Sequence, residues 1–198
     1  MAKLWQKVDP RRWVALSSPV TLGFALAALI ALILQGLTGG ASTRLLFSVY
    51  RAPAGDVLSY LRLFLHVLGH ADFAHYAGNL GLFLVLGPLV EARYGSKRFL
   101  LMLLITALVT GLAHLLLSPG SAALGASGLV FMLIMLSAIG AGQGKKVPLT
   151  LILVALIYLG GELFGGIFQR DSISQLGHIM GGVCGIVMGL LWKPKGTA

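Results

Sequence analysis

The chain has few of the residues that hold small secreted domains together or that cover soluble ones. Its 198 residues include one cysteine, and charged residues make up only 11% of the sequence. A single cysteine excludes an internal disulfide framework. Charged residues average about 25% in soluble domains, so this chain has too few to surround an ordinary soluble core. The composition is 57% hydrophobic, which also excludes an intrinsically disordered chain.

Negative charge is the scarcest kind. Six acidic side chains stand against 15 Lys and Arg, which gives a formal net charge of +9. In a soluble protein such an excess would indicate nucleic-acid binding. Here the positive charge belongs to a strongly hydrophobic chain, so we expect a lipid bilayer, and no nucleic acid, as its partner.

Long hydrophobic runs are what the sequence has in abundance. A membrane-spanning helix needs about 20 apolar residues, and only helices or closed barrels satisfy their backbone groups in lipid. The runs do not alternate in polarity, so we predict an all-α, polytopic membrane protein. The six predicted transmembrane helices lie near 18–37, 74–92, 98–117, 126–142, 148–168 and 175–192.

The domain layout follows from these runs. A basic tail (1–17) precedes a membrane domain (18–192), and a short tail (193–198) follows it. The first run is longer than the hydrophobic region of a signal peptide and has no clear cleavage site after it, so we expect it to be retained. The outer loop at 38–73 is long, and we expect it to lie partly embedded in the outer leaflet, with Asp56 capping a short helix.

The loops differ in charge. Eleven of the 15 cationic residues lie on the side that holds both termini, and the other four lie opposite, balanced by four acidic residues. The positive-inside rule places both termini in the cytoplasm, as a multi-pass protein of the plasma (inner) membrane. The second, fourth and sixth helices therefore begin at the outer face.

Polar residues inside membrane helices are costly and indicate function. Ser127, His178 and the pair His75/Asn79 each lie at the start of an even-numbered helix, so we expect one cluster just below the outer surface. A neutral imidazole within reach of a serine can act as general base and then general acid. Ser127 could instead be a helix cap, and His178 a polar tie between helices.

Glycines surround two of these residues. Ser127 stands in Gly125-Ala-Ser-Gly128, where glycines allow a tight turn and close backbone approach. His178 adjoins a four-residue repeat of glycines that lets helix backbones nearly touch. The repeat comprises Gly177, Gly181, Gly185 and Gly189. His75 and Asn79 are four residues apart, so they share a helix face and offer two hydrogen-bond donors for a negative oxygen.

Other polar residues have simpler interpretations. His66, His70 and His75 could form a zinc site, but no cysteine lies near them and Asp72 is the only close carboxylate, so no metal or cofactor is expected. His114 is interpreted as a structural histidine and Cys184 as a small packing residue. Glu162 fits either a proton relay or a polar helix end.

Four motifs occur in a characteristic order. They are His70…His75-x-x-x-Asn79, Gly87-x-x-x-Glu91-x-x-x-Gly95, Gly125-Ala-Ser127-Gly128 and His178-x-x-Gly181-x-x-x-Gly185. Together they resemble the rhomboid intramembrane serine proteases in their basic six-helix form, over about residues 60–190.

The resemblance implies a serine–histidine dyad that cleaves transmembrane segments of other membrane proteins through an acyl-enzyme. Ser127 would be the nucleophile, His178 the base, and His75, Asn79 and the Ser127 backbone N–H the oxyanion hole. Supporting positions would be His70, Gly125, Gly128, Phe131, Gly181 and Gly185, and structural ones Arg62, Glu91 and Arg93. The fifth helix and the loop at 169–174 would correspond to the region that moves aside for substrate.

Two positions depart from the family pattern. Phe131 stands where many members have a tyrosine that stacks on the catalytic histidine, and the Trp-Arg pair of the first loop reads Leu61-Arg62. Neither change removes a catalytic group. One alternative is a catalytically silent rhomboid-like protein that binds membrane clients, which typically lacks the serine or histidine kept here. Another is a small transporter built around Glu162 and His114. The sequence predicts neither the natural substrate nor the oligomeric state.

Overall fold

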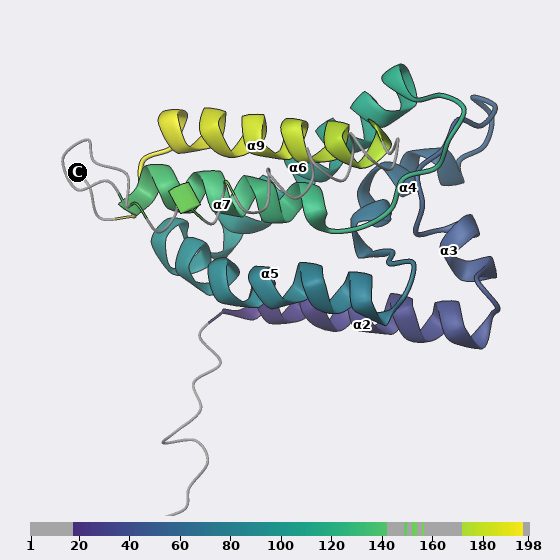
Figure 1. Ribbon diagram of the computed structural model, residues 1–198, viewed down its shortest axis with the longest axis horizontal. Coiled ribbons are helices and arrows are strands. Elements are labelled where there is room, and N and C mark those ends of the chain that lie inside the picture. The colour runs from purple at the N-terminus through teal and green to yellow at the C-terminus, as the bar shows by residue number, and fades with distance from the viewer. Residues whose placement is uncertain (1–17, 142–148, 150–151, 154–155, 157–171, 196–198) are drawn as a thin grey trace, which may run out of the picture.

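The computed structural model describes residues 18–141, 149, 152–153, 156 and 172–195. Its regular structure in these residues is helical, apart from an isolated antiparallel bridge between Val49 and Ala123. Figure 1 shows a bundle in which α2 and α5 lie side by side and α7 lies between α5 and α9. The elements are α2 (Pro19–Leu37), α3 (Ala41–Leu45), α4 (Leu58–Leu65), η2 (His66–Leu68), α5 (Phe73–Tyr94), α6 (Ser96–Leu117), α7 (Ser127–Ala141) and α9 (Ser172–Leu191).

Helices cover five of the six predicted hydrophobic runs. α2, α5 and α6 are long and apolar enough to cross a membrane, whereas α7 and α9 contain shorter apolar stretches. The predicted run at 148–168 lies largely outside the described residues, as do Glu162 and the loop before α9. The all-helical class is confirmed for the part of the chain that the structure describes.

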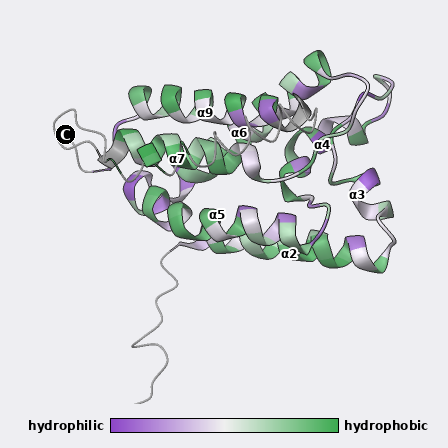
Figure 2. Cartoon of the chain, in the orientation of Figure 1, coloured by the Kyte–Doolittle hydropathy of each residue, from purple (hydrophilic) through white to green (hydrophobic). Residues whose placement is uncertain are grey.

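Hydrophobic residues predominate along these helices (Figure 2), and many of the large ones are exposed. Leu26 on α2 is 59% exposed, Val85 on α5 is 63% exposed and Leu190 on α9 is 72% exposed. A soluble surface would not present large aliphatic side chains in such numbers on several helices. Lipid is the solvent in which these faces are stable.

Glu91 fixes α2 against the far end of α5. Its carboxylate accepts hydrogen bonds from the backbone N–H groups of Val20 (3.0 Å) and Thr21 (2.9 Å) and from the Thr21 hydroxyl (2.8 Å). The first N–H groups of a helix have no partner within the helix, so the buried carboxylate caps α2 from 70 residues away. Gly87, one turn earlier, leaves room for the Thr21 side chain.

Glycines bring α7 and α9 into the most extensive contact between any two described elements. A Cβ atom on Gly181 would overlap the carbonyl oxygen of Gly128, and one on Gly185 would overlap that of Met132. Only glycine permits backbones to approach this closely. The predicted glycine face is therefore the face of α9 that meets α7.

The long loop between α2 and α5 is folded against the bundle. It contains α3, α4 and η2. The N-cap position of α4 is Val57 and not Asp56, but the Asp56 carboxylate does accept a hydrogen bond from the N–H of Leu58, the first residue of α4 (3.1 Å). Arg62 is buried, pairs with Asp56 (2.7 Å) and donates to the Leu45 carbonyl (2.8 Å). The guanidinium also lies over the Tyr50 ring, and its bond to Asp56 holds the pKa of that carboxyl below its usual value.

Candidate active site

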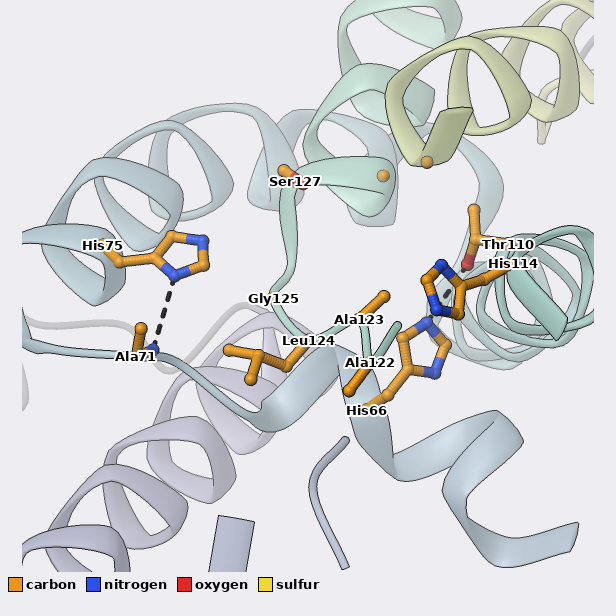
Figure 3. Close-up of a pocket in the computed structure, with 12 residues that line it drawn as sticks. His66, Ala71, His75, Thr110, His114, Ala122, Ala123, Leu124, Gly125 and Ser127 are labelled. Carbon is orange, nitrogen blue, oxygen red and sulfur yellow. Dashed lines mark hydrogen bonds between the residues drawn. The ribbon is translucent and has the colours of Figure 1, made fainter. Parts of the chain in front are cut away.

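A cavity of about 320 Å³ opens where the loop, α6 and the start of α7 meet. Ser127 lies at one edge, His75 lies on one side, and His66, Thr110 and His114 lie on the other side (Figure 3). The structure thus brings together residues that are more than 50 positions apart in the sequence.

Ser127 is the first residue of α7. The chain reaches it through Gly125, whose φ of +119° is a conformation that residues with a side chain rarely adopt. Ala126, between them, is completely buried. The turn therefore holds the serine at a helix N-terminus, where backbone N–H groups are available for a negative oxygen.

His178 lies beside this turn. Its buried imidazole stacks on Phe131, with ring centroids 4.5 Å apart and planes inclined by 17°. Phe131 is one helical turn beyond Ser127, so both lie on the same face of α7. The backbones also meet here, because a Cβ on Gly128 would lie 3.1 Å from the carbonyl oxygen of Gly177. The stacking predicted for a ring at position 131 is present without a phenolic hydroxyl.

His75 and Asn79 face the turn from α5. A Cβ placed on Gly125 would lie 2.9 Å from His75 Nε2 and 3.8 Å from Asn79 Nδ2. The Ala71 N–H donates to His75 Nδ1 (3.4 Å, Figure 3), so the neutral ring carries its proton on Nε2, the atom nearer Gly125. Asn79 Nδ2 is buried and has no acceptor among the described residues. Both nitrogens are donors held near Ser127.

His70 and Asp72 fix the position of His75. Asp72 caps α5 by accepting a hydrogen bond from the His75 N–H (2.7 Å). The His70 ring packs edge-on with the rings of His75 and Tyr76, with centroids 5.1 Å and 5.4 Å away. Burial, together with the nearby His75, lowers the pKa of His70 to about 4. His70 is therefore neutral near pH 7.

The opposite wall of the cavity was not predicted from the sequence. His66 Nδ1 contacts the Arg62 carbonyl (3.1 Å) and its Nε2 contacts the Thr110 hydroxyl (3.4 Å). His114 Nε2 contacts the Ser121 carbonyl (3.1 Å). Burial lowers the pKa of His66 to about 4. The signal that could have revealed this wall is the four-residue spacing of Thr106, Thr110 and His114, which places three polar groups on one face of an otherwise apolar helix.

Several predicted residues lie away from the cavity. Arg62 and Glu91 hold the loop and the opposite end of the bundle, as described above, and the Arg93 carbonyl accepts a hydrogen bond from the Lys195 N–H (2.9 Å). Cys184 is buried in the core. His66 lies across the cavity from His75, and in the described part of the chain no three His, Cys, Asp or Glu side chains are grouped to hold a metal.

Comparisons with known proteins all point to the same family. The family model for the rhomboid domain matches residues 58–195. Rhomboid protease GluP of Bacillus subtilis is 30% identical over 172 residues, which are 83% of this chain and 32% of that protein. Rhomboid protease GlpG of Pectobacterium atrosepticum is 29% identical over 177 residues, which are 87% of this chain and 62% of that protein. Rhomboid-like protein 11, chloroplastic, of Arabidopsis thaliana is 28% identical over 138 residues, which are 62% of this chain and 48% of that protein.

The aligned residues make up a larger share of this chain than of its relatives. The chain spans less than two thirds of the length of each of these three relatives. The family model nevertheless covers more than half of the chain, including every residue of the predicted cluster. The chain belongs to the rhomboid family.

Proposed function

We propose that this protein is an intramembrane serine endopeptidase that cuts transmembrane segments of other membrane proteins near the outer face. The observation that carries the proposal is the convergence of Ser127, His75 and Asn79 on the Gly125 turn, next to the stacked pair His178–Phe131. Relatives named as proteases in two bacteria support the same reaction class.

Ser127 and His178 act as a dyad in this proposal. The serine Oγ attacks the carbonyl carbon of the scissile peptide while the imidazole takes the hydroxyl proton. The stacked Phe131 ring and the close backbones at Gly128 restrict the imidazole to one orientation. The protonated ring then gives its proton to the leaving amine, which releases one product and leaves an acyl-enzyme. A water molecule, deprotonated by the same imidazole, hydrolyses this ester.

The oxyanion is stabilised from two elements. His75 Nε2–H and Asn79 Nδ2–H approach from α5, and the backbone N–H of Ser127 approaches from the start of α7. Donors fixed in advance in a low-dielectric site are worth more than the same donors in water. The polar wall of His66, Thr110 and His114 makes the cavity suitable for the water that the second half-reaction consumes.

The proposed substrate is a helix that must first open. Backbone hydrogen bonds shield the peptide bonds of a regular helix, so we expect cleavage near small or helix-breaking residues. The proposed orientation places both termini in the cytoplasm and the cavity toward the outer face, with residues 18–192 as the membrane domain. No cofactor takes part.

A cleavage assay tests this function. The full chain is purified in neutral detergent and incubated with a model single-span substrate, and the products are identified by mass spectrometry. We expect cleavage by the wild type and by Ser42→Ala, a serine of α3 outside the cavity, and none by Ser127→Ala. Full cleavage by Ser127→Ala contradicts the dyad. Client binding without cleavage by the wild type indicates the catalytically silent alternative.

A further inference from the structure

The end of the bundle opposite the cavity carries a groove that the proposed proteolysis does not use. It has a volume of about 310 Å³ and lies between the start of α6 and the end of α9. Its lining consists of two cationic side chains, one tryptophan and two leucines: Arg98, Lys193, Trp192, Leu101 and Leu191.

The polar part of the groove is strongly positive. Arg98 and Lys193 are exposed, and Arg98 Nη1 donates to the Lys193 carbonyl (2.9 Å), which fixes the two residues next to each other. Lys97 and Lys195 lie on the same end of the bundle. Among the described residues Glu91 is the acidic side chain at this end, and its oxygens are occupied by α2. The described ion pair, Arg62–Asp56, belongs to the other end.

The apolar part of the groove faces lipid. Leu101 is 47% exposed and Leu191 is 72% exposed, and both belong to helices of the membrane domain. Trp192 also lines the groove, and in the chain it stands between Leu191, the last residue of α9, and Lys193. Tryptophan is enriched at this depth, where its ring contacts both acyl chains and headgroups. The groove thus changes from apolar to cationic along its length, as a phospholipid changes from acyl chain to phosphate.

We propose that this groove binds one anionic phospholipid, with its phosphodiester between Arg98 and Lys193 and an acyl chain along Leu101 and Leu191. Charge complementarity favours an anionic lipid, because the headgroup of a zwitterionic lipid would add its own cation to a site that already has several. In the orientation proposed above, this end faces the leaflet where anionic lipids give the surface a negative potential. A bound phosphate would also offset the placement of Lys97 and Arg98 in the first turn of α6, where the helix dipole disfavours cations.

Native mass spectrometry of the full chain in neutral detergent tests the site. Dioleoyl phosphatidylglycerol and dioleoyl phosphatidylcholine are titrated separately, and bound lipids are counted at each concentration. We expect one phosphatidylglycerol to bind more tightly than phosphatidylcholine. Affinity should fall about fivefold in Lys193→Gln and about 25-fold when Arg98→Gln is added. Lys193→Gln keeps the carbonyl that Arg98 contacts, so it decides the result if the double variant does not fold.

Arg44→Gln is the matched control, because it removes one exposed cation from α3 at the other end of the bundle. It should leave phosphatidylglycerol affinity unchanged. Equal binding of the two lipids, an equal loss in Arg44→Gln, or displacement of the lipid by millimolar inorganic phosphate would each overturn the proposal. The readout involves no peptide cleavage and no membrane orientation, so it fails or succeeds independently of the proposed protease activity.

Discussion

The two ends of the helix bundle use polar residues in opposite ways. Beside the cavity the polar groups are buried: burial lowers the pKa of His66 and of His70 to about 4, so both are neutral near pH 7, and the buried Arg62 is paired with Asp56. At the other end the cations Arg98 and Lys193 are exposed. Exposed charge fixes a membrane protein in its bilayer, whereas chemistry needs buried polar groups of fixed orientation.

Acid should affect the cavity end most. His66 and His70 stay neutral in the folded protein down to about pH 4, whereas in the unfolded chain they take up protons below about pH 6.5. The unfolded state then binds more protons between these pH values, so stability falls as the pH falls across this window. The loss is about 1.4 kcal/mol per pH unit for each histidine.

Denaturant unfolding in mixed micelles at pH 7 and pH 4.5 measures this loss. His66→Gln should lose less stability between the two pH values than the wild type, because one of the two titrating groups is gone. Equal stability of the wild type at both pH values would show that His66 and His70 are not held neutral by burial at the cavity end.

Loss of Asn79, the proposed oxyanion donor on α5, should have the next largest effect. Asn79→Ala removes a buried donor that has no other described acceptor, so kcat should fall about 10²–10³-fold, with KM changed much less. Steady-state cleavage of a model substrate gives both constants. Thr38→Ala, at the end of α2 outside the cavity, is the control and should keep the wild-type kcat. A rise in KM alone would assign Asn79 to substrate binding.

The glycine face of α9 allows the two ends to be compared within one helix. Gly181→Ala sets a Cβ against the Gly128 backbone beside Ser127 and should cost about 2–3 kcal/mol and most of the activity. A Cβ on Gly189, nearer the basic end, would have as its nearest neighbours atoms of the Ile139 side chain, with Cδ1 at 2.9 Å, and not backbone atoms. The stability of Gly189→Ala should stay within about 1 kcal/mol of the wild type, because alanine also favours a helix. Equal losses in the two variants, measured by thermal unfolding and cleavage, would contradict the backbone contact.

Exposed charge at the basic end should matter least to folding. Lys97→Gln removes an exposed cation at the start of α6, and the free energy of unfolding should change by less than about 0.5 kcal/mol. A loss as large as that of Gly181→Ala would show that this end also depends on fixed polar contacts. Unfolding in a neutral detergent measures it without a lipid contribution.

What the sequence predicts well is what repeats along a helix. The hydrophobic runs gave the helices, and the four-residue glycine spacing gave the face of α9 that meets α7. The four-residue spacing of His75 and Asn79 predicts a shared helix face, and both residues face the Gly125 turn. These features depend on local periodicity, which is present in any single sequence.

What the sequence does not predict depends on distant contacts. The hydrogen bond between Glu91 and the start of α2 joins residues 70 positions apart, and no local sequence pattern predicts it. The four-residue spacing on α6 groups Thr110 with His114, but His66 comes from the loop, and its place on the same wall is seen only in the folded chain. The contact of His114 with the Ser121 carbonyl fits the structural role that the sequence indicates, but His114 also lines the cavity.

Covalent labelling of Ser127 tests whether this residue is the nucleophile. The wild type in neutral detergent is treated with a fluorophosphonate probe, and the modified peptide is identified by mass spectrometry. We expect one adduct, on Ser127, that is lost in Ser127→Ala and strongly reduced in His178→Ala, whereas Ser42→Ala labels normally. Labelling that persists in Ser127→Ala, or a folded wild type that takes up no probe, would contradict that role.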